Sequence, residues 1–401
     1  MNKYYFIYKD RGVSIDNEVL TKIVKDAEKK AIYQYNRLKK PTILSKKLYI
    51  HACIRKTILE DIAKNRKHPH PPSELKHSID LYLLFPKETR KKFIKEINTS
   101  PDKERRNIWN RYNIDYKKTE RAFIGLTIQR NLWAQKEGFR DFIHKNLIRY
   151  AIPLEKYKRM TKNIRYLISF CQDMISQKNI NFKKYKYSEF YKPCYICTSN
   201  SFPFKDTKEI EDMMYKNYKI LKSVKKKIEI NYGDFSSTKY VPERDVFEIY
   251  ISKDENFRHQ SILLIHELLH VVDYMNRIKK GLFPSDEGEY IQEYRVLNMF
   301  MSLFKNKFPR FYSNIFSDFL NLFMIIFFET ELHNNPNQNL GKLYATVYNI
   351  CYPNANLKIN RAWLLRENVL DYPLSFLPHA VACSEFILKS TNFQNNSKRY
   401  S

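Results

Sequence analysis

Apolar residues recur every three or four positions over residues 119–148, a pattern that predicts amphipathic helices. The apolar positions in this stretch are Phe123, Leu126, Ile128, Leu132, Phe139, Phe142, Ile143 and Leu147. Gly138 interrupts the pattern and predicts a break between two helices, and Pro153 predicts the start of another helix that runs to Ile175. Helical spacing resumes after residue 254 and continues to the end of the chain.

Two short segments before residue 254 follow a different pattern. Residues 228–232 (IEINY) alternate apolar and polar positions, and residues 246–251 (VFEIYI) are rich in β-branched and aromatic side chains. Gly233 and Pro242 supply turns between these two segments. We therefore expect a small antiparallel sheet immediately before the next helix.

Glycine content supports a mainly α-helical fold class. The chain has 7 glycines in 401 residues, far below the usual share of about 7%, so it has little material for tight turns or glycine-rich phosphate loops. A proline-rich segment at residues 67–73 breaks the helical pattern, and charged helical stretches continue to about residue 115. We interpret residues 1–115 as an accessory N-terminal helical region and residues 393–401 as a polar C-terminal tail.

The formal net charge of +28 would favour nucleic acid or an anionic membrane surface as a partner. The basic residues are scattered along the chain without a nucleic-acid-binding motif, so we expect no specific nucleic-acid partner. The first residues contain no apolar core of signal-peptide length, and the apolar run at residues 319–328 is too short to span a bilayer, which takes about 20 residues. With six widely spread cysteines, these features predict a soluble, cytoplasmic protein.

The sequence His266-Glu267-Leu268-Leu269-His270 lies inside an unbroken apolar helical pattern. Spacing i, i+4 places both histidines on one helix face, where their imidazoles can bind a single Zn²⁺ ion, one per chain. Glu267 then lies beside the metal as the predicted general base for hydrolysis.

A catalytic zinc needs a third protein ligand. Glu289 and Glu293 lie 19 and 23 residues beyond His270 on a predicted second helix, and their i, i+4 spacing places them on one face. One of them is expected to bind the metal. The other, or Asp273, is expected to orient a ligand from outside the metal shell or to serve as an alternative ligand.

The chain resembles the oligoendopeptidase F and thimet oligopeptidase family of zinc peptidases. Residues 130–142 (RNLWAQKEGFRDF) and 151–157 (AIPLEKY) are similar to the family's helix pair and to the proline-started helix that follows it. The resemblance covers roughly residues 116–392, which we interpret as the catalytic region. It implies a two-lobed, mostly helical zincin fold with a substrate channel beside the small sheet, and it favours Glu293 over Glu289 as the third ligand.

A segment near the carboxyl end, residues 367–380, resembles the part of the family in which a histidine and two tyrosines surround the substrate carbonyl. Tyr372 takes the place of the first tyrosine by spacing, whereas His379 replaces the second tyrosine and Glu367 replaces the histidine. The resemblance implies that Tyr372 and His379 donate hydrogen bonds to the developing oxyanion. An ionised Glu367 has no proton to donate.

These features predict a metalloendopeptidase that acts on short peptides or unfolded polypeptide, and they leave its oligomeric state open. Two alternatives stay open at this stage. One is an effector protease delivered into another cell to cleave a single folded target. The other is a catalytically inactive relative that binds peptides or a protein partner. The replacements at positions 367 and 379 favour it, and the intact His266, Glu267 and His270 disfavour it.

Overall fold

The computed structural model describes residues 15–37, 46–65, 84–176, 203–233, 236–242, 244–253, 257–282, 289–366, 369–370 and 372–391. The chain divides into two units, each made of two separate segments. Unit 1 comprises Met1–Lys67 and Thr198–Pro309, and unit 2 comprises His68–Cys197 and Arg310–Ser401. The region boundaries expected at residues 115 and 392 stay predictions.

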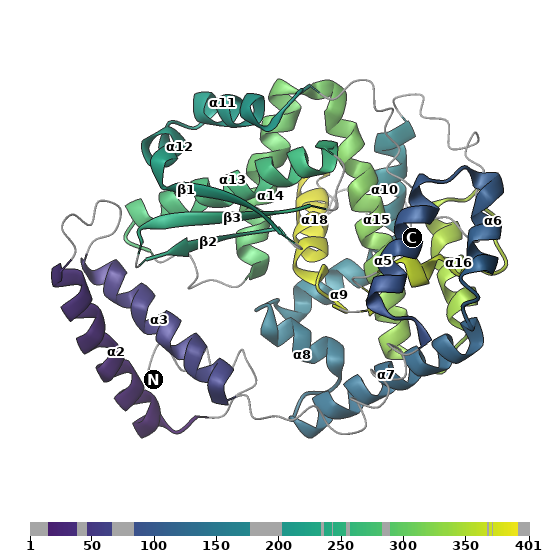
Figure 1. The fold of residues 1–401 in the computed structure, drawn as a ribbon, viewed down its shortest axis with the longest axis horizontal. Coiled ribbons are helices and arrows are strands. Elements are labelled where there is room, and N and C mark those ends of the chain that lie inside the picture. The colour runs from purple at the N-terminus through teal and green to yellow at the C-terminus, as the bar shows by residue number, and fades with distance from the viewer. Residues whose placement is uncertain are drawn as a thin grey trace. The chain divides into compact units, whose positions relative to one another are not determined.

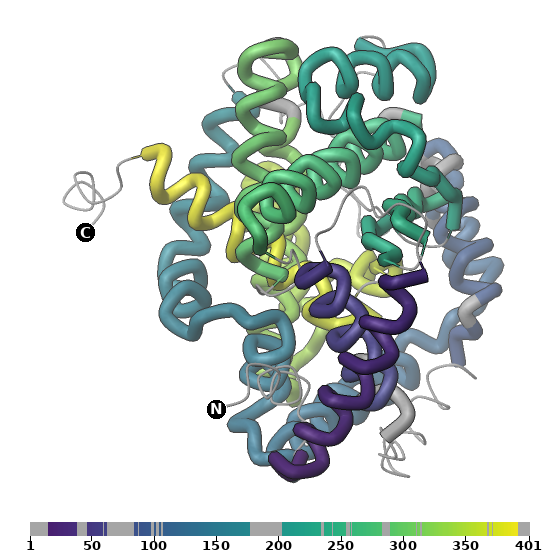
Figure 2. Tube along the Cα trace, turned by 90° about the vertical axis from the view of Figure 1, so that its left-hand side faces the viewer, coloured from purple at the N-terminus to yellow at the C-terminus, as the bar shows by residue number. Residues whose placement is uncertain are grey.

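Unit 1 contains the small sheet and the helices on either side of it in sequence (Figure 1). Its elements are α2 (Asn17–Arg37), α3 (Lys46–Asn65), α11 (Thr207–Asn217), α12 (Lys219–Val224), η3 (Lys225–Lys227), β1 (Ile228–Gly233), β2 (Ser237–Val241), β3 (Val246–Ser252), α13 (Phe257–Lys279) and α14 (Glu289–Lys307). Helices α2 and α3 lie side by side (Figure 2) and share a core of Leu20, Ala27, Ile54 and Ile58.

The sheet is mixed, with strand order β1-β3-β2. β3 pairs with β1 in parallel and with β2 in antiparallel register, so the prediction of an antiparallel sheet was wrong for the two strands on which it was based. The reason is β2, which the sequence pattern did not reveal. It returns the chain before β3 begins, and β3 therefore runs in the same direction as β1 and lies between the other two strands.

Helix α13 is the central element of unit 1. It contacts β2 and β3 as well as α11, α12 and α14 (Figure 1). Its apolar side chains Ile265, Leu268, Leu269 and Val271 are fully buried. This burial explains why the helix is apolar on nearly all sides, since a helix of that kind needs neighbours all round.

The regular elements in the described residues of unit 2 are all helices. Its elements are α5 (Lys87–Thr99), α6 (Asp102–Arg111), α7 (Tyr116–Lys136), α8 (Phe142–Arg149), α9 (Leu154–Lys162), α10 (Ile164–Ser176), α15 (Pro309–Asn334, which starts at the unit boundary), α16 (Leu340–Cys351), η5 (Ala362–Leu365) and α18 (Leu377–Ser390). The buried Trp363 stacks on Phe123 with ring centroids 5.3 Å apart, and its indole N–H donates to the Tyr116 hydroxyl at 2.9 Å.

The helix break expected at Gly138 is present. Helix α7 ends at Lys136, Gly138 takes a left-handed φ of 87°, and Asp141 then caps α8 by accepting from the His144 amide at 2.7 Å. The helix expected from Pro153 to Ile175 is divided at Asn163 into α9 and α10. The prediction of a mainly helical fold with a small sheet ahead of the His-Glu-x-x-His helix is confirmed.

Among the helices in the described ranges, none combines the length and the apolar character that crossing a lipid bilayer requires.

Candidate functional site

His266 and His270 lie one turn apart on α13, as their spacing predicts. Their Nε2 atoms are 3.1 Å apart, so both rings direct the same type of nitrogen toward one point. His270 is buried and His266 is half-buried. The buried leucines between them in sequence anchor the opposite faces of the helix and leave the imidazoles little freedom to turn away.

Glu293 on α14 is the carboxylate that meets these histidines. Its Oε2 lies 3.3 Å from Nε2 of His266, and its Oε1 lies 3.3 Å from Nε2 of His270. Glu293 is buried, whereas Glu289, one turn earlier at the first position of α14, is exposed. The packing of α14 on α13 therefore brings Glu293 to the imidazoles.

A charged pair ties the two helices together beside this cluster. The Arg295 guanidinium on α14 donates from Nε to Asp273 Oδ1 at 2.7 Å and from Nη2 to Oδ2 at 2.8 Å. This two-point geometry holds Arg295 in a fixed orientation. Because Arg295 is two residues from Glu293 and Asp273 is three residues from His270, the pair stabilises the helix contact that brings the cluster together. Both Asp273 oxygens are engaged by Arg295.

Glu267, the predicted base, is buried between α13 and the sheet. Its Oε2 accepts a hydrogen bond from Oγ1 of Thr238 on β2 at 2.7 Å, and its main-chain oxygen lies 3.0 Å from the same hydroxyl. The side chain is thus held on the sheet side of the helix, next to the two histidines in sequence.

Negative charge is concentrated around His270. Burial by itself lowers the pKa of His270, but Glu293, followed by Glu267 and Asp273, raises it to about 9. Burial, with the charges of Glu267, Asp273 and Glu293, raises the pKa of the Tyr274 hydroxyl, which keeps that side chain neutral. Three carboxylates within two packed helices make this a region that attracts cations.

Tyr372 and His379 belong to unit 2. Tyr372 is 62% exposed. His379 is half-buried in the first turn of α18, with its ring centroid 6.2 Å from that of Phe376. Glu367 lies outside the described residues. Because Tyr372 and His379 are in a different unit from the histidines of α13, their predicted roles toward a common substrate stay predictions.

Two buried polar side chains hold the turn that carries Tyr372. Glu329 on α15 accepts from the Leu374 amide at 2.8 Å, and Arg130 on α7 lies 3.4 Å from the Leu370 carbonyl oxygen. Leu374 has a left-handed φ of 60°, a conformation that a non-glycine residue adopts only at a cost. The contacts to residues 370 and 374 anchor the backbone on both sides of Tyr372.

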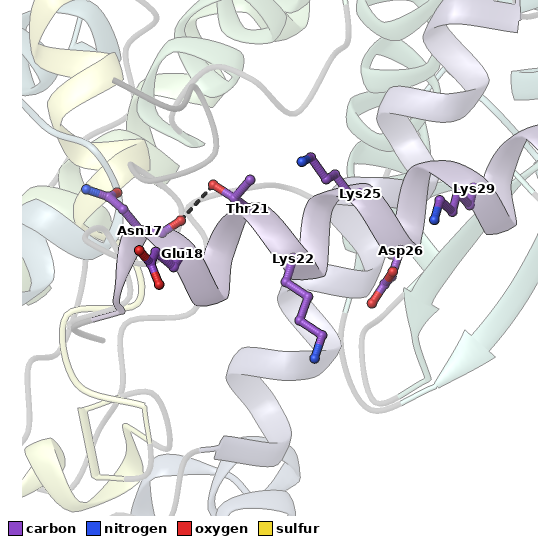
Figure 3. A pocket seen from close by; sticks show the side chains of 7 residues that line it. All are labelled: Asn17, Glu18, Thr21, Lys22, Lys25, Asp26 and Lys29. Atoms are coloured by element: carbon purple, nitrogen blue, oxygen red, sulfur yellow. Dashed lines mark hydrogen bonds between the residues drawn. The ribbon is translucent and has the colours of Figure 1, made fainter.

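A surface depression of about 470 Å³ lies on α2 (Figure 3). Its lining consists of Asn17, Glu18, Thr21, Lys22, Lys25, Asp26 and Lys29. All seven come from one helix, so the depression lacks the convergence of groups from several elements that a substrate site needs.

Sequence reasoning missed two residues of the site, Thr238 and Arg295. Arg295 shares a helix with Glu293, and a signal for it was available, since a buried aspartate such as Asp273 requires a cationic partner. Thr238 lies in a strand that the pattern did not predict, because residues 237–241 contain both serine and lysine and are only five residues long.

Replacement of Arg295 by leucine is expected to destabilise the protein. The variant leaves the buried Asp273 carboxylate without its counter-charge, which typically costs about 3–5 kcal/mol of unfolding free energy. The double variant Asp273→Asn/Arg295→Leu should recover much of that loss. Urea unfolding of the three proteins measures both values, and equal losses in the single and double variants would contradict the role assigned to the pair.

Glu329 predicts a pH dependence of stability. Burial raises the pKa of Glu329 to about 8, against the opposing effects of the Leu374 amide and Arg130, whereas the unfolded carboxyl titrates near its ordinary value of 4.5. Between these two values the folded state retains a proton that the unfolded state has released. The stability contributed by the protonated Glu329 is therefore present below pH 4.5 and is lost as pH rises through about 8.

Glu329→Gln, which keeps an acceptor for the Leu374 amide, should remove this dependence. The wild type is expected to lose unfolding free energy relative to the variant by up to about 1.4 kcal/mol per pH unit across that interval. The test is to measure the unfolding free energy of both proteins in urea at pH 5.5 and at pH 8. A constant difference between the two proteins would show that Glu329 is ionised throughout.

No known family model matches the sequence, and no curated protein matches it either. Two solved structures are similar in fold. The first, a 3.1 Å X-ray structure of a protein provisionally identified as oligoendopeptidase F, is 13% identical, covers 99% of this chain and 77% of its own, and superimposes with a TM-score of 0.54. The second, a protein from Bacillus anthracis str. Ames with the same provisional identification, is 10% identical, covers 92% of this chain and 86% of its own, and has a TM-score of 0.47. At these identities the first likeness establishes a shared helical fold.

Proposed function

We propose that the protein is a zinc-dependent peptidase whose metal is held by His266, His270 and Glu293. The observation that carries the proposal is the convergence of two imidazole nitrogens and one carboxylate, with donor separations of 3.1–3.3 Å. Donors at about 2.0–2.1 Å from one ion in tetrahedral arrangement lie about 3.3 Å from one another. The donor set fits zinc in both chemistry and spacing.

Glu267 acts as the general base and acid in this proposal. Zinc, when bound, supplies Lewis acidity that polarises the scissile carbonyl and acidifies the attacking water. The Glu267 carboxylate accepts a proton from that water as its oxygen bonds to the carbonyl carbon. The same carboxyl later gives the proton to the leaving amine as the C–N bond breaks.

The proposed substrates are short, unstructured peptides. Two observations support this choice. Strand β2 lies at one edge of the sheet and contacts α13, so a peptide added to that edge as a further strand would run beside the helix of the predicted metal ligands. The fold is also similar to that of a protein provisionally identified as an oligoendopeptidase.

Tyr372 and His379 are proposed donors to the oxyanion that develops on the substrate carbonyl. The exposure of Tyr372 suits a residue that contacts substrate. The anchoring of its turn by Glu329 and Arg130 suits a residue that must be held in one place before substrate arrives.

Replacement of Glu267 by glutamine is expected to abolish hydrolysis while leaving the metal bound. The amide cannot accept the water's proton, so kcat should fall by about 10²- to 10⁴-fold. Zinc content by atomic absorption and cleavage of a mixed library of unstructured peptides, measured on the variant and the wild type, provide the test. Stoichiometric zinc with no cleavage by the wild type would favour a single-target protease or a peptide-binding relative, and a folded protein that takes up no zinc would refute the proposal.

The two glutamates of α14 offer a matched pair for identifying the third ligand. Glu293→Gln should weaken zinc binding by more than the 10- to 100-fold typical of a change outside the metal shell, whereas Glu289→Gln should leave it unchanged. Competition against a chelator of known affinity gives the zinc dissociation constant of each variant. Equal effects of the two substitutions would remove Glu293 from the ligand set.

A further inference from the structure

Thr238 is a hydroxyl-bearing residue on a face of the sheet that is otherwise apolar or aromatic. Side chains alternate along β2, so Thr238 and Tyr240 point to the same side. Their cross-strand partners on β3 are Ile249 and Phe247, both fully buried. Phe247 lies with its ring centroid 6.3 Å from that of Tyr274, which identifies this face as the one that packs on α13.

Packing alone does not require a hydroxyl at position 238. Valine has nearly the same shape and a higher preference for strands. Thr238 is half-buried, and a hydroxyl withdrawn from water costs free energy unless it is hydrogen-bonded, so the reason for threonine lies in its partner. That partner is Glu267, whose Oε2 accepts a hydrogen bond from Oγ1 of Thr238 at 2.7 Å.

The same hydroxyl lies 3.0 Å from the main-chain oxygen of Glu267. Thr238 thus contacts one residue at two points, one near the helix axis and one at the end of the side chain. A hydroxyl has one hydrogen to donate. The carboxylate oxygen Oε2 is a stronger acceptor than the main-chain oxygen and is closer, so it receives that hydrogen. Because Thr238 lies on a strand that packs on α13, this hydrogen bond to Oε2 restricts rotation of the Glu267 side chain.

The two carboxylate oxygens of Glu267 consequently differ. Oε2 accepts from Thr238, while Oε1 accepts no hydrogen bond from any described residue. Proton transfer depends on the orientation of the accepting oxygen, and an error of about 1 Å in placement can cost 100-fold in rate. We infer that Thr238 is a positioning residue, which holds Oε2 on the sheet side and directs Oε1 of Glu267 toward the attacking water.

This inference rests on the proposed peptidase function, and the variants Thr238→Val and Thr238→Ser test it, with Ser237→Ala as a control on the opposite face of the same strand. Steady-state kinetics on a cleaved peptide, zinc content and the melting temperature are measured for each protein. In Thr238→Val we expect kcat to fall about 10- to 100-fold, the rate equivalent of a lost hydrogen bond to a charged group, with KM and zinc content unchanged. Thr238→Ser should restore most of kcat, and Ser237→Ala should match the wild type.

A wild-type kcat in Thr238→Val would overturn the inference. So would a loss that serine does not rescue, or a loss that follows the zinc content or the melting temperature, because either result indicates that Thr238 only joins the sheet to the helix. Failure of the proposed function looks different: the wild type and Ser237→Ala would then bind zinc without cleaving any peptide, and the inference about Thr238 would fall with it.

Discussion

The approach of Glu293 to two imidazoles on the neighbouring helix imposes the main constraint on unit 1. It requires α14 to cross α13 where both histidines face it, and it adds a buried carboxylate to a region that already holds Glu267 and Asp273. Buried charges are costly unless each is compensated. Asp273 is paired with Arg295, and Glu267 accepts a hydrogen bond from Thr238. The partners of Glu293 are the two imidazoles.

The strand order of the mixed sheet decides which strand meets Glu267. With β3 in the centre, β2 becomes an edge strand in contact with α13, and it presents a threonine to Glu267. One short strand therefore provides both an edge of the sheet and a hydrogen bond to the proposed base.

In unit 2, two buried polar side chains hold backbone rather than other side chains. In a chain with 7 glycines, left-handed turns fall largely on other residues. Among the described residues, the non-glycine positions with positive φ are Asn113, Ala151, Asp245, Asn356 and Leu374, beside Gly138 and Gly281. Asparagine and aspartate tolerate this conformation, whereas leucine does so at a cost. At Leu374 a hydrogen bond to the fully buried carboxyl group of Glu329 offsets that cost and fixes the turn that exposes Tyr372.

Local periodicity was enough to predict the helices of residues 119–148, the break at Gly138 and the common face of His266 and His270, because each depends on residues within one or two turns of each other. It was not enough to choose between Glu289 and Glu293. Four residues apart, they share a face of α14, and the position at which that helix crosses α13 leaves one exposed and the other buried.

The direction of the strands, the pairing of Arg295 with Asp273 and the bond from Thr238 to Glu267 were decided by tertiary structure alone. The residues in these two contacts are 22 and 29 positions apart in the chain, beyond the reach of any helical or strand repeat. Such contacts depend on how whole elements pack. The sequence by itself therefore determined which polar residues α13 carries on the face of His266 and His270, and the packing of α14 and β2 decided which partners they have.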